Sequence, residues 1–107
     1  MGFFDILRGR DIDQGVKEYE ETEGAVLLDV RTPQEYRAGH IPGSKNIPLQ
    51  ELGRVGAVAA GQEVPLFVYC QSGARSGRAA GELRHMGYRR VKNIGGMSAY
   101  TGKVELV

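Results

Sequence analysis

Two short and almost continuous runs of apolar residues are the strongest strand signals in this 107-residue sequence. They are residues 25–30 (AVLLDV), which include one carboxylate, and residues 66–69 (LFVY). Short runs that are rich in branched and aromatic residues are typical of strands buried on both faces of a parallel sheet. Weaker strand signals occur at residues 11–12, 44–47 and 91–94. The pattern therefore predicts a sheet built from short strands.

Helical patterns fall between these strand signals. Asp13 can cap a helix that runs to about residue 21. Residues 32–35 (TPQE) form a capping box with proline at the first helical position, so a second helix should begin there. Residues 76–86 (SGRAAGELRHM) predict a third helix, which Gly87 ends. Strands that alternate with helices predict an α/β fold, with helices on both faces of a parallel sheet.

Composition narrows the class of protein to one soluble globular domain. The content of 41% hydrophobic and 25% charged residues is ordinary for such a domain. A net charge of +1 provides no general attraction to nucleic acid or to an anionic membrane. No apolar run approaches the roughly 18 residues of a membrane span, and the first ten residues do not resemble a secretory signal. We therefore expect no nucleic-acid partner and no membrane association.

The single cysteine limits both redox and metal chemistry. One cysteine excludes an intrachain disulfide, and the sequence contains no CxxC motif or Cys/His cluster. The sequence therefore predicts no metal site, no cofactor and a reduced, cytoplasmic location.

That cysteine, Cys70, directly follows the LFVY run and precedes a Gly- and Ser-containing turn and a helix. Ligands of parallel sheets bind at the carboxyl ends of the strands, where Cys70 and Asp29 both fall. A loop that enters a helix presents unpaired backbone N–H groups, which stabilise a thiolate and lower the thiol pKa. Gly73 permits the unusual backbone angles of such a loop, and Arg75 adds a planar fork of donors for an oxyanion. The combination predicts an activated nucleophile.

A structural interpretation competes with the functional one at each of these positions. A cysteine after a strand can be an inert core thiol, but the adjoining loop, Arg75 and helix favour a nucleophile at Cys70. His40 and His85 could serve as general bases. We assign His40 a structural role in the turn GHIPGS and place His85 on the surface of a helix. We therefore predict no Cys–His pair.

Four stretches in order resemble the single-domain rhodanese family of sulfurtransferases. They are residues 27–48 (LLDVRTPQEYRAGHIPGSKNIP), 68–76 (VYCQSGARS), 83–88 (LRHMGY) and 91–100 (VKNIGGMSAY). The resemblance implies a three-layer fold with a central five-stranded parallel sheet. It places the rhodanese domain at residues 11–107, after a lead-in at residues 1–10.

The resemblance also implies an activity. Cys70 would take a sulfane sulfur from thiosulfate or another small donor, hold it as a persulfide, and pass it to cyanide, a thiol or a sulfur-accepting protein. Arg75 would bind the oxyanion. The other residues that would line the loop are Gln71, Ser72, Gly73 and Ala74. By the same resemblance, Asp29 and Arg31 would be structural residues near the site, with Arg31 paired to Glu35.

Two alternatives belong to other functional classes. Related phosphatases and arsenate reductases have one more residue between cysteine and arginine. The four residues between Cys70 and Arg75 make a smaller ring, which suits a single sulfur atom. A non-catalytic sulfur carrier or binding module is the stronger alternative, because Gln71 replaces a frequent basic residue and Tyr100 a frequent tryptophan.

Charge is unevenly distributed along the chain. Residues 70–90 contain five arginines and one glutamate, whereas residues 11–23 contain six carboxylates and one lysine. We interpret the acidic stretch as a solvated helix surface. The basic stretch predicts a positive potential around Cys70 that would steer anionic donors.

Overall fold

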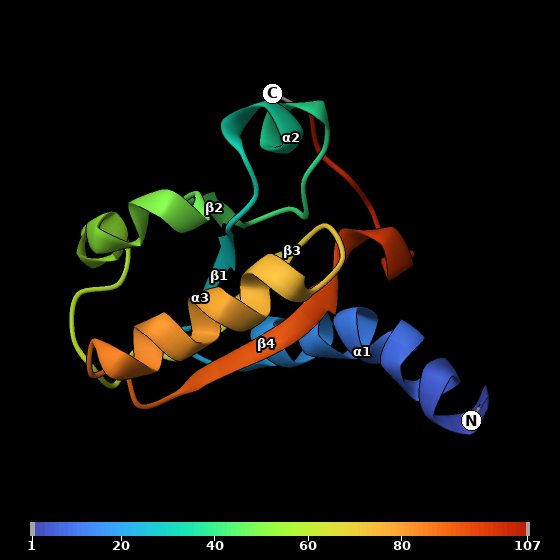
Figure 1. Ribbon diagram of the computed structural model, residues 1–107, viewed down its shortest axis with the longest axis horizontal. Helices are drawn as coiled ribbons and strands as arrows, with labels where there is room; N and C mark the ends of the chain where they lie inside the picture. The colour runs from blue at the N-terminus through green and yellow to red at the C-terminus, as the bar shows by residue number, and fades with distance from the viewer. Residues whose placement is uncertain (1, 107) are drawn as a thin grey trace.

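The computed structural model describes the backbone of residues 2–106 and the side chains of residues 12–106. The elements follow the chain in this order: α1 (Gly2–Glu21), β1 (Val26–Asp29), α2 (Pro33–Ala38), β2 (Lys45–Asn46), the 3₁₀ segment η1 (Leu49–Ala57), β3 (Leu66–Cys70), α3 (Ala74–His85), β4 (Val91–Gly96) and the 3₁₀ turn η2 (Met97–Ala99). Figure 1 shows this alternation of strands and helices, which confirms the predicted α/β class.

The strands form one parallel sheet in the order β2-β1-β3-β4. Its centre consists of the two apolar runs, and all five residues of β3 are buried. The described chain has four strands in the sheet, so the expectation of five is corrected. The signal at residues 11–12 lies inside α1, because a single β-branched residue, Ile12, does not interrupt a continuous helix. Ile12 instead packs from that helix into the core, with 1% of its surface exposed.

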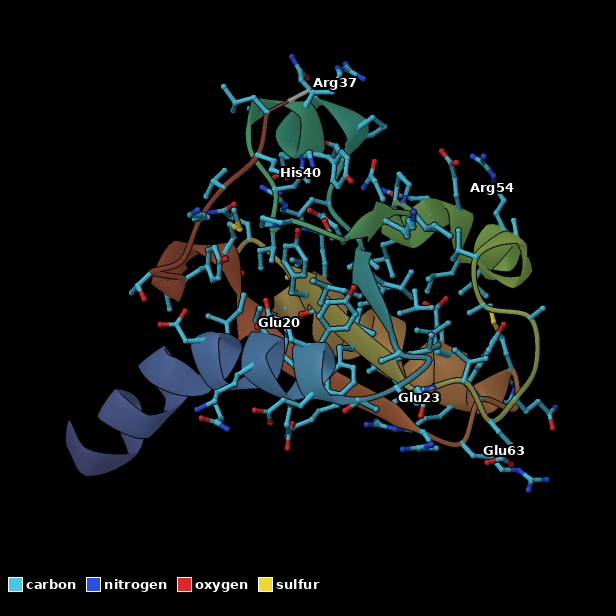
Figure 2. The ribbon with its side chains drawn as sticks, turned by 180° about the vertical axis from the view of Figure 1, so that it is seen from behind. Glu20, Glu23, Arg37, His40, Arg54 and Glu63 are labelled. Carbon is cyan, nitrogen blue, oxygen red and sulfur yellow. The ribbon has the colours of Figure 1, made fainter. Side chains whose placement is uncertain are left out.

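Helices cover both faces of the sheet, and strand alternation divides the core between them. Leu28 and Val68 face α3 and η1, whereas Leu27 and Phe67 face α1. The view in Figure 1 has α3 in front of the strands, and the reverse view in Figure 2 has α1 in front. The three-layer arrangement is therefore confirmed.

Helix boundaries are predicted well where a local cap defines them. The capping box of α2 is present: Glu35 N–H donates to Thr32 Oγ1 at 3.1 Å, and Thr32 N–H donates to Glu35 Oε1 at 2.9 Å. By contrast, α1 begins at Gly2 rather than Asp13. The helix therefore crosses the boundary at residue 11, which stays a prediction. None of the helices among residues 2–106 is long and apolar enough to cross a membrane.

Candidate active site

The only cysteine lies at the carboxyl end of the central strand β3, beneath the loop that leads into α3. The loop folds over its sulfur: Gly73 N–H donates to Cys70 Sγ at 3.0 Å, and Ser76 Oγ lies 3.4 Å from the same atom. Gly73 has a φ of +102°, in the left-handed region that favours glycine, and this turns its N–H toward the sulfur. Cys70 is 0% exposed, so a donor reaches it only when the loop opens.

These contacts make Cys70 more acidic than an ordinary thiol. Burial alone raises its pKa, because it disfavours the charged form. Hydrogen bonds from the Ser76 hydroxyl and from the N–H groups of Ser76, Gly73 and Ser72 lower the pKa and outweigh burial. The net pKa of Cys70 is below its ordinary value, which favours the nucleophilic thiolate.

Strand β4, which pairs with β3, contacts the loop and the start of α3. Its register against β3 shifts between Val68 and Tyr69, so that Val68 pairs with Asn93 and Tyr69 with Gly95. This bulge aims the Asn93 amide at the start of α3, where Ser76 Oγ donates to Asn93 Oδ1 at 2.7 Å. Gly95 N–H donates to the same Asn93 oxygen at 3.0 Å.

Gly96 allows the loop to approach β4 closely. A Cβ at this position would lie 2.5 Å from the backbone oxygen of Gln71 and 2.7 Å from Cα of Ser72. Only glycine fits between the strand and the loop without moving one of them.

Arg75 is held by a carboxylate from another element. Its Nη1 donates to Glu35 Oε1 at 2.8 Å, and its Nη2 donates to Glu35 Oε2 at 3.0 Å. This bidentate hydrogen bonding from Arg75 is the main reason that the pKa of Glu35 is lowered to about 2. The expected pairing of Glu35 with Arg31 is therefore wrong. Glu35 points to α3, because the capping box fixes its direction. The role of Arg75 in binding an oxyanion stays a prediction.

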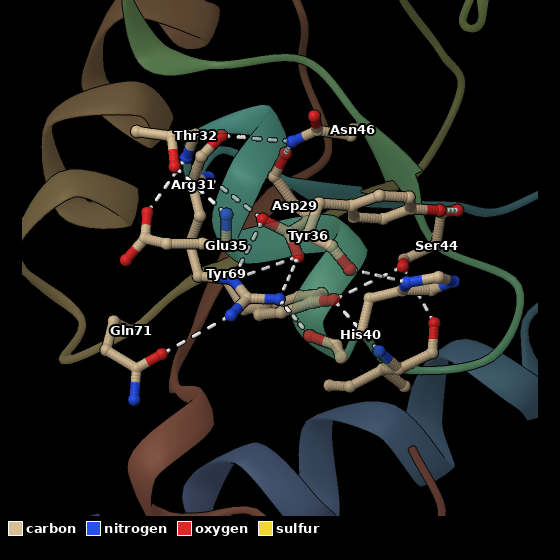
Figure 3. A network of polar contacts seen from close by, with 12 residues as sticks. Asp29, Arg31, Thr32, Glu35, Tyr36, His40, Ser44, Asn46, Tyr69 and Gln71 are labelled. Carbon is tan, nitrogen blue, oxygen red and sulfur yellow. Dashed lines mark hydrogen bonds and ion pairs between the residues drawn. The ribbon is translucent and has the colours of Figure 1, made fainter. Parts of the chain in front are cut away.

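Asp29 and Arg31 form a buried ion pair beside the loop (Figure 3). Arg31 donates through Nε and Nη2 to the Asp29 carboxylate, with the shortest contact at 2.7 Å. The same guanidinium donates to the carbonyl oxygen of Gly39 at 2.7 Å and reaches Gln71 Oε1 at 3.4 Å. The pair thus links β1, α2 and the first residue of the loop.

The proposed loop residues lie together, between β3 and α3. Gln71, Ser72 and Gly73 form the turn, and Ala74 and Arg75 begin α3. Ser76, Asn93 and Gly96 were not predicted from the sequence as parts of the site, and Glu35 was not predicted as the partner of Arg75. Ser76 could have been found from its place next to the loop, whereas the other three are too distant in the chain.

The two histidines have no place in this geometry. His40 Nδ1 lies 2.9 Å from the carbonyl oxygen of Tyr36, and its ring stacks on the Tyr36 ring with centroids 3.8 Å apart. This agrees with the structural role predicted for His40. His85 is exposed at the end of α3. Within residues 12–106, no group of three or more His, Cys, Asp or Glu side chains could hold a metal ion.

The fold and this cysteine loop define the class of protein. Residues 13–103 match the rhodanese-like domain, and the chain belongs to that family. It is 39% identical over 71 residues to the thiosulfate sulfurtransferase PspE of Escherichia coli, covering 65% of this chain and 68% of PspE. It is 36% identical over 90 residues to the putative sulfur carrier protein YrkF of Bacillus subtilis, covering 83% of this chain and 48% of YrkF.

Solved structures agree with this assignment. A rhodanese with anions from E. coli superposes with a TM-score of 0.73 at 33% identity, covering 78% of this chain and 99% of that one. The chain spans between about a quarter and three quarters of the length of the curated relatives compared with it.

Proposed function

We propose that this protein is a sulfurtransferase that carries a sulfane sulfur as a persulfide on Cys70. The observation that supports this most directly is the geometry of the loop. A buried thiol of lowered pKa receives hydrogen bonds from Gly73 and Ser76. Membership in a family with named sulfurtransferases points the same way.

The reaction has two displacements. The Cys70 thiolate attacks the outer sulfur of the donor, an Sγ–S bond forms, and the donor's S–S bond breaks. The leaving group departs with the electron pair, as sulfite when the donor is thiosulfate. An acceptor thiolate or cyanide then attacks the outer sulfur of the persulfide and releases Cys70. The N–H groups that acidify the thiol would stabilise the terminal sulfur of the persulfide in the same way.

The test of this proposal is sulfur loading followed by transfer. Incubation with a sulfur donor should add the mass of one sulfur atom to the peptide that contains Cys70, and a thiol acceptor should remove it. Cys70→Ser should take up no sulfur. Loading of the serine variant would refute the assignment of the nucleophile.

A sulfur carrier is the second candidate, favoured by the similarity to YrkF. A carrier would load one equivalent of sulfur and release it only to a specific protein, whereas an enzyme would turn over with small acceptors. Multiple-turnover production of thiocyanate from thiosulfate and cyanide would support the enzyme.

We also propose that the protein lacks phosphatase activity, that it works in a reducing compartment, and that its partners are sulfur donors and acceptors. We expect no hydrolysis of p-nitrophenyl phosphate, because the ring between Cys70 and Arg75 is one residue shorter than the phosphatase ring. A reducing compartment such as the cytoplasm suits the free thiol. The partners would be a small sulfur donor and a thiol, cyanide or protein acceptor.

A further inference from the structure

Two arginines lie beside the Cys70 loop: Arg31 contacts Gln71, and Arg75 is in the first turn of α3. Each of them forms an ion pair with a carboxylate. Arg75 holds Glu35 through two parallel hydrogen bonds of 2.8 and 3.0 Å. Arg31 holds Asp29 at 2.7 Å. The Asp29 carboxylate is completely buried and Arg31 is 4% exposed, so water screens that pair little. Two cations and two carboxylates beside the loop leave no net charge from these four groups.

The basic character predicted for residues 70–90 is therefore weaker in the fold than in the sequence. Arg89 is also paired, with Glu63 at 3.1 Å. Arg78, Arg84 and Arg90 are exposed and form no ion pair with a carboxylate among residues 12–106, so the stretch keeps part of its positive charge. Position 71, the first loop residue, carries a neutral glutamine.

The hydrogen-bond donors nearest Cys70 Sγ donate to that sulfur. The Gly73 N–H and the Ser76 hydroxyl both reach Cys70 Sγ. The two terminal nitrogens of Arg75, the groups best suited to grip a sulfonate, already hold Glu35. A doubly charged donor would have to compete with this carboxylate for them.

We propose that Glu35 is a specificity-determining residue, which neutralises Arg75 and makes an organic persulfide, R–S–SH, a better donor than thiosulfate. This rests on the proposed sulfurtransferase function. The Cys70 thiolate forms a bond to the outer sulfur, the S–S bond of the donor persulfide breaks, and its electron pair leaves with the thiolate R–S⁻. The proton stays on the transferred sulfur, and no oxidant or reductant is needed. This leaving group has no sulfonate that requires a free cation.

Glu35→Gln is a sharp test because the change removes the charge and keeps the local fold. Glutamine at this position also completes a capping box, so α2 should retain its start. Glu63→Gln is the matched control, since it breaks the Glu63–Arg89 ion pair on the surface. Equal circular dichroism spectra of the two variants and the wild type would establish that the fold is retained.

Two pairs of probes report the charge around Cys70. Iodoacetate and iodoacetamide alkylate the same thiolate and differ by one negative charge, so their rate ratio cancels loop opening and thiol pKa. Thiosulfate and cysteine persulfide, whose ammonium and carboxylate charges cancel, test the donors. Mass spectrometry measures the initial rate at which each adds to Cys70.

The wild type should load sulfur faster from cysteine persulfide than from thiosulfate. Glu35→Gln should raise the iodoacetate/iodoacetamide ratio by about fivefold to tenfold, the effect of one unit charge a few ångströms away with partial screening. It should raise the thiosulfate/persulfide ratio by a larger factor, because thiosulfate carries two negative charges. Glu63→Gln should leave both ratios unchanged.

Three results would overturn the proposal: thiosulfate loading as fast as persulfide in the wild type, an unchanged alkylation ratio in Glu35→Gln, or an equal change in Glu63→Gln. Failure of every donor to load sulfur would refute the sulfurtransferase function as well. In that case the alkylation ratio still measures whether Glu35 neutralises Arg75, so the two failures are distinguishable.

Discussion

Replacing Ser76 with alanine should raise the pKa of Cys70, because it removes about 1.5 kcal/mol of stabilisation from the thiolate. Ser76 is completely buried, and its hydroxyl lies 3.4 Å from Cys70 Sγ. A hydrogen bond to a charged group contributes about 1.5–3 kcal/mol, and one pKa unit corresponds to about 1.4 kcal/mol. The low end applies here because the contact is long and the single hydroxyl proton is shared with Asn93 Oδ1, at 2.7 Å.

The pH dependence of alkylation by iodoacetamide measures this shift. Below the wild-type pKa of Cys70, the thiolate fraction of Ser76→Ala should fall about tenfold, while the more basic thiolate becomes about threefold more nucleophilic. The variant should therefore react about threefold more slowly than the wild type at low pH and about threefold faster at high pH. The two pH–rate curves should cross.

A second variant, Asn93→Ala, tests the same hydrogen bond from Ser76 to Cys70. It removes the nearest of the acceptors that compete for the Ser76 hydroxyl, while the carbonyl oxygens of Gly73 at 3.1 Å and Gly95 at 3.5 Å remain. The hydroxyl then donates more often to Sγ, so the pKa of Cys70 should fall. General loosening of the loop would instead shift both variants in the same direction. Superimposed curves for Ser76→Ala and the wild type, or a raised pKa in Asn93→Ala, would refute this account of the acidic thiol.

Three further predictions concern the supporting structure. Gly96→Ala should slow alkylation and sulfur loading at least about tenfold, because its Cβ would lie 2.5 Å from a backbone oxygen of the loop; Gly53→Ala, whose Cβ meets open space, should react like the wild type. Asp29→Asn should lower the free energy of unfolding in urea by about 3–5 kcal/mol, because it leaves the buried charge of Arg31 without a partner; a loss below 1 kcal/mol would contradict this account. Gly81→Ala, also in open space inside α3, should raise that free energy by about 1 kcal/mol, and a lower melting temperature would disprove the prediction.

Features that depend on neighbouring residues could be predicted from the sequence. The strand β3, the turn after Cys70 and the helix α3 follow from one continuous stretch of apolar, glycine and helix-forming residues. The capping box at Thr32 and Glu35 is equally local, and it is present in the structure. The start of α1 was misplaced because Asp13 is a good capping residue, yet the helix continues through it to Gly2.

The ion pairs show where sequence proximity misleads. Glu35 is four residues from Arg31, with which it was expected to pair. Asp29 and Arg31, however, flank a single residue at the end of β1, so they project to the same side of the chain and meet. Glu35 is thereby left to bind Arg75, 40 positions away, because the fold places the first turn of α2 beside the first turn of α3.

The Asn93 contact required the bulge in β4. Gly95 and Gly96 are a sequence signal for a bulge, but they do not indicate that it aims Asn93 at the start of α3.

The hydrogen-bond donors at Cys70 and the Arg75–Glu35 ion pair affect the charge of the site in different ways. Cys70 is acidified by N–H and O–H donors that touch its sulfur, and such short contacts stabilise one atom without attracting ions from a distance. A free arginine would also lower the thiol pKa, but its field would draw any abundant dianion toward the loop. Because Glu35 compensates Arg75, the thiolate is stabilised without that attraction. The arrangement therefore separates activation of the nucleophile from selection of the donor, and it assigns the second task to one carboxylate on α2.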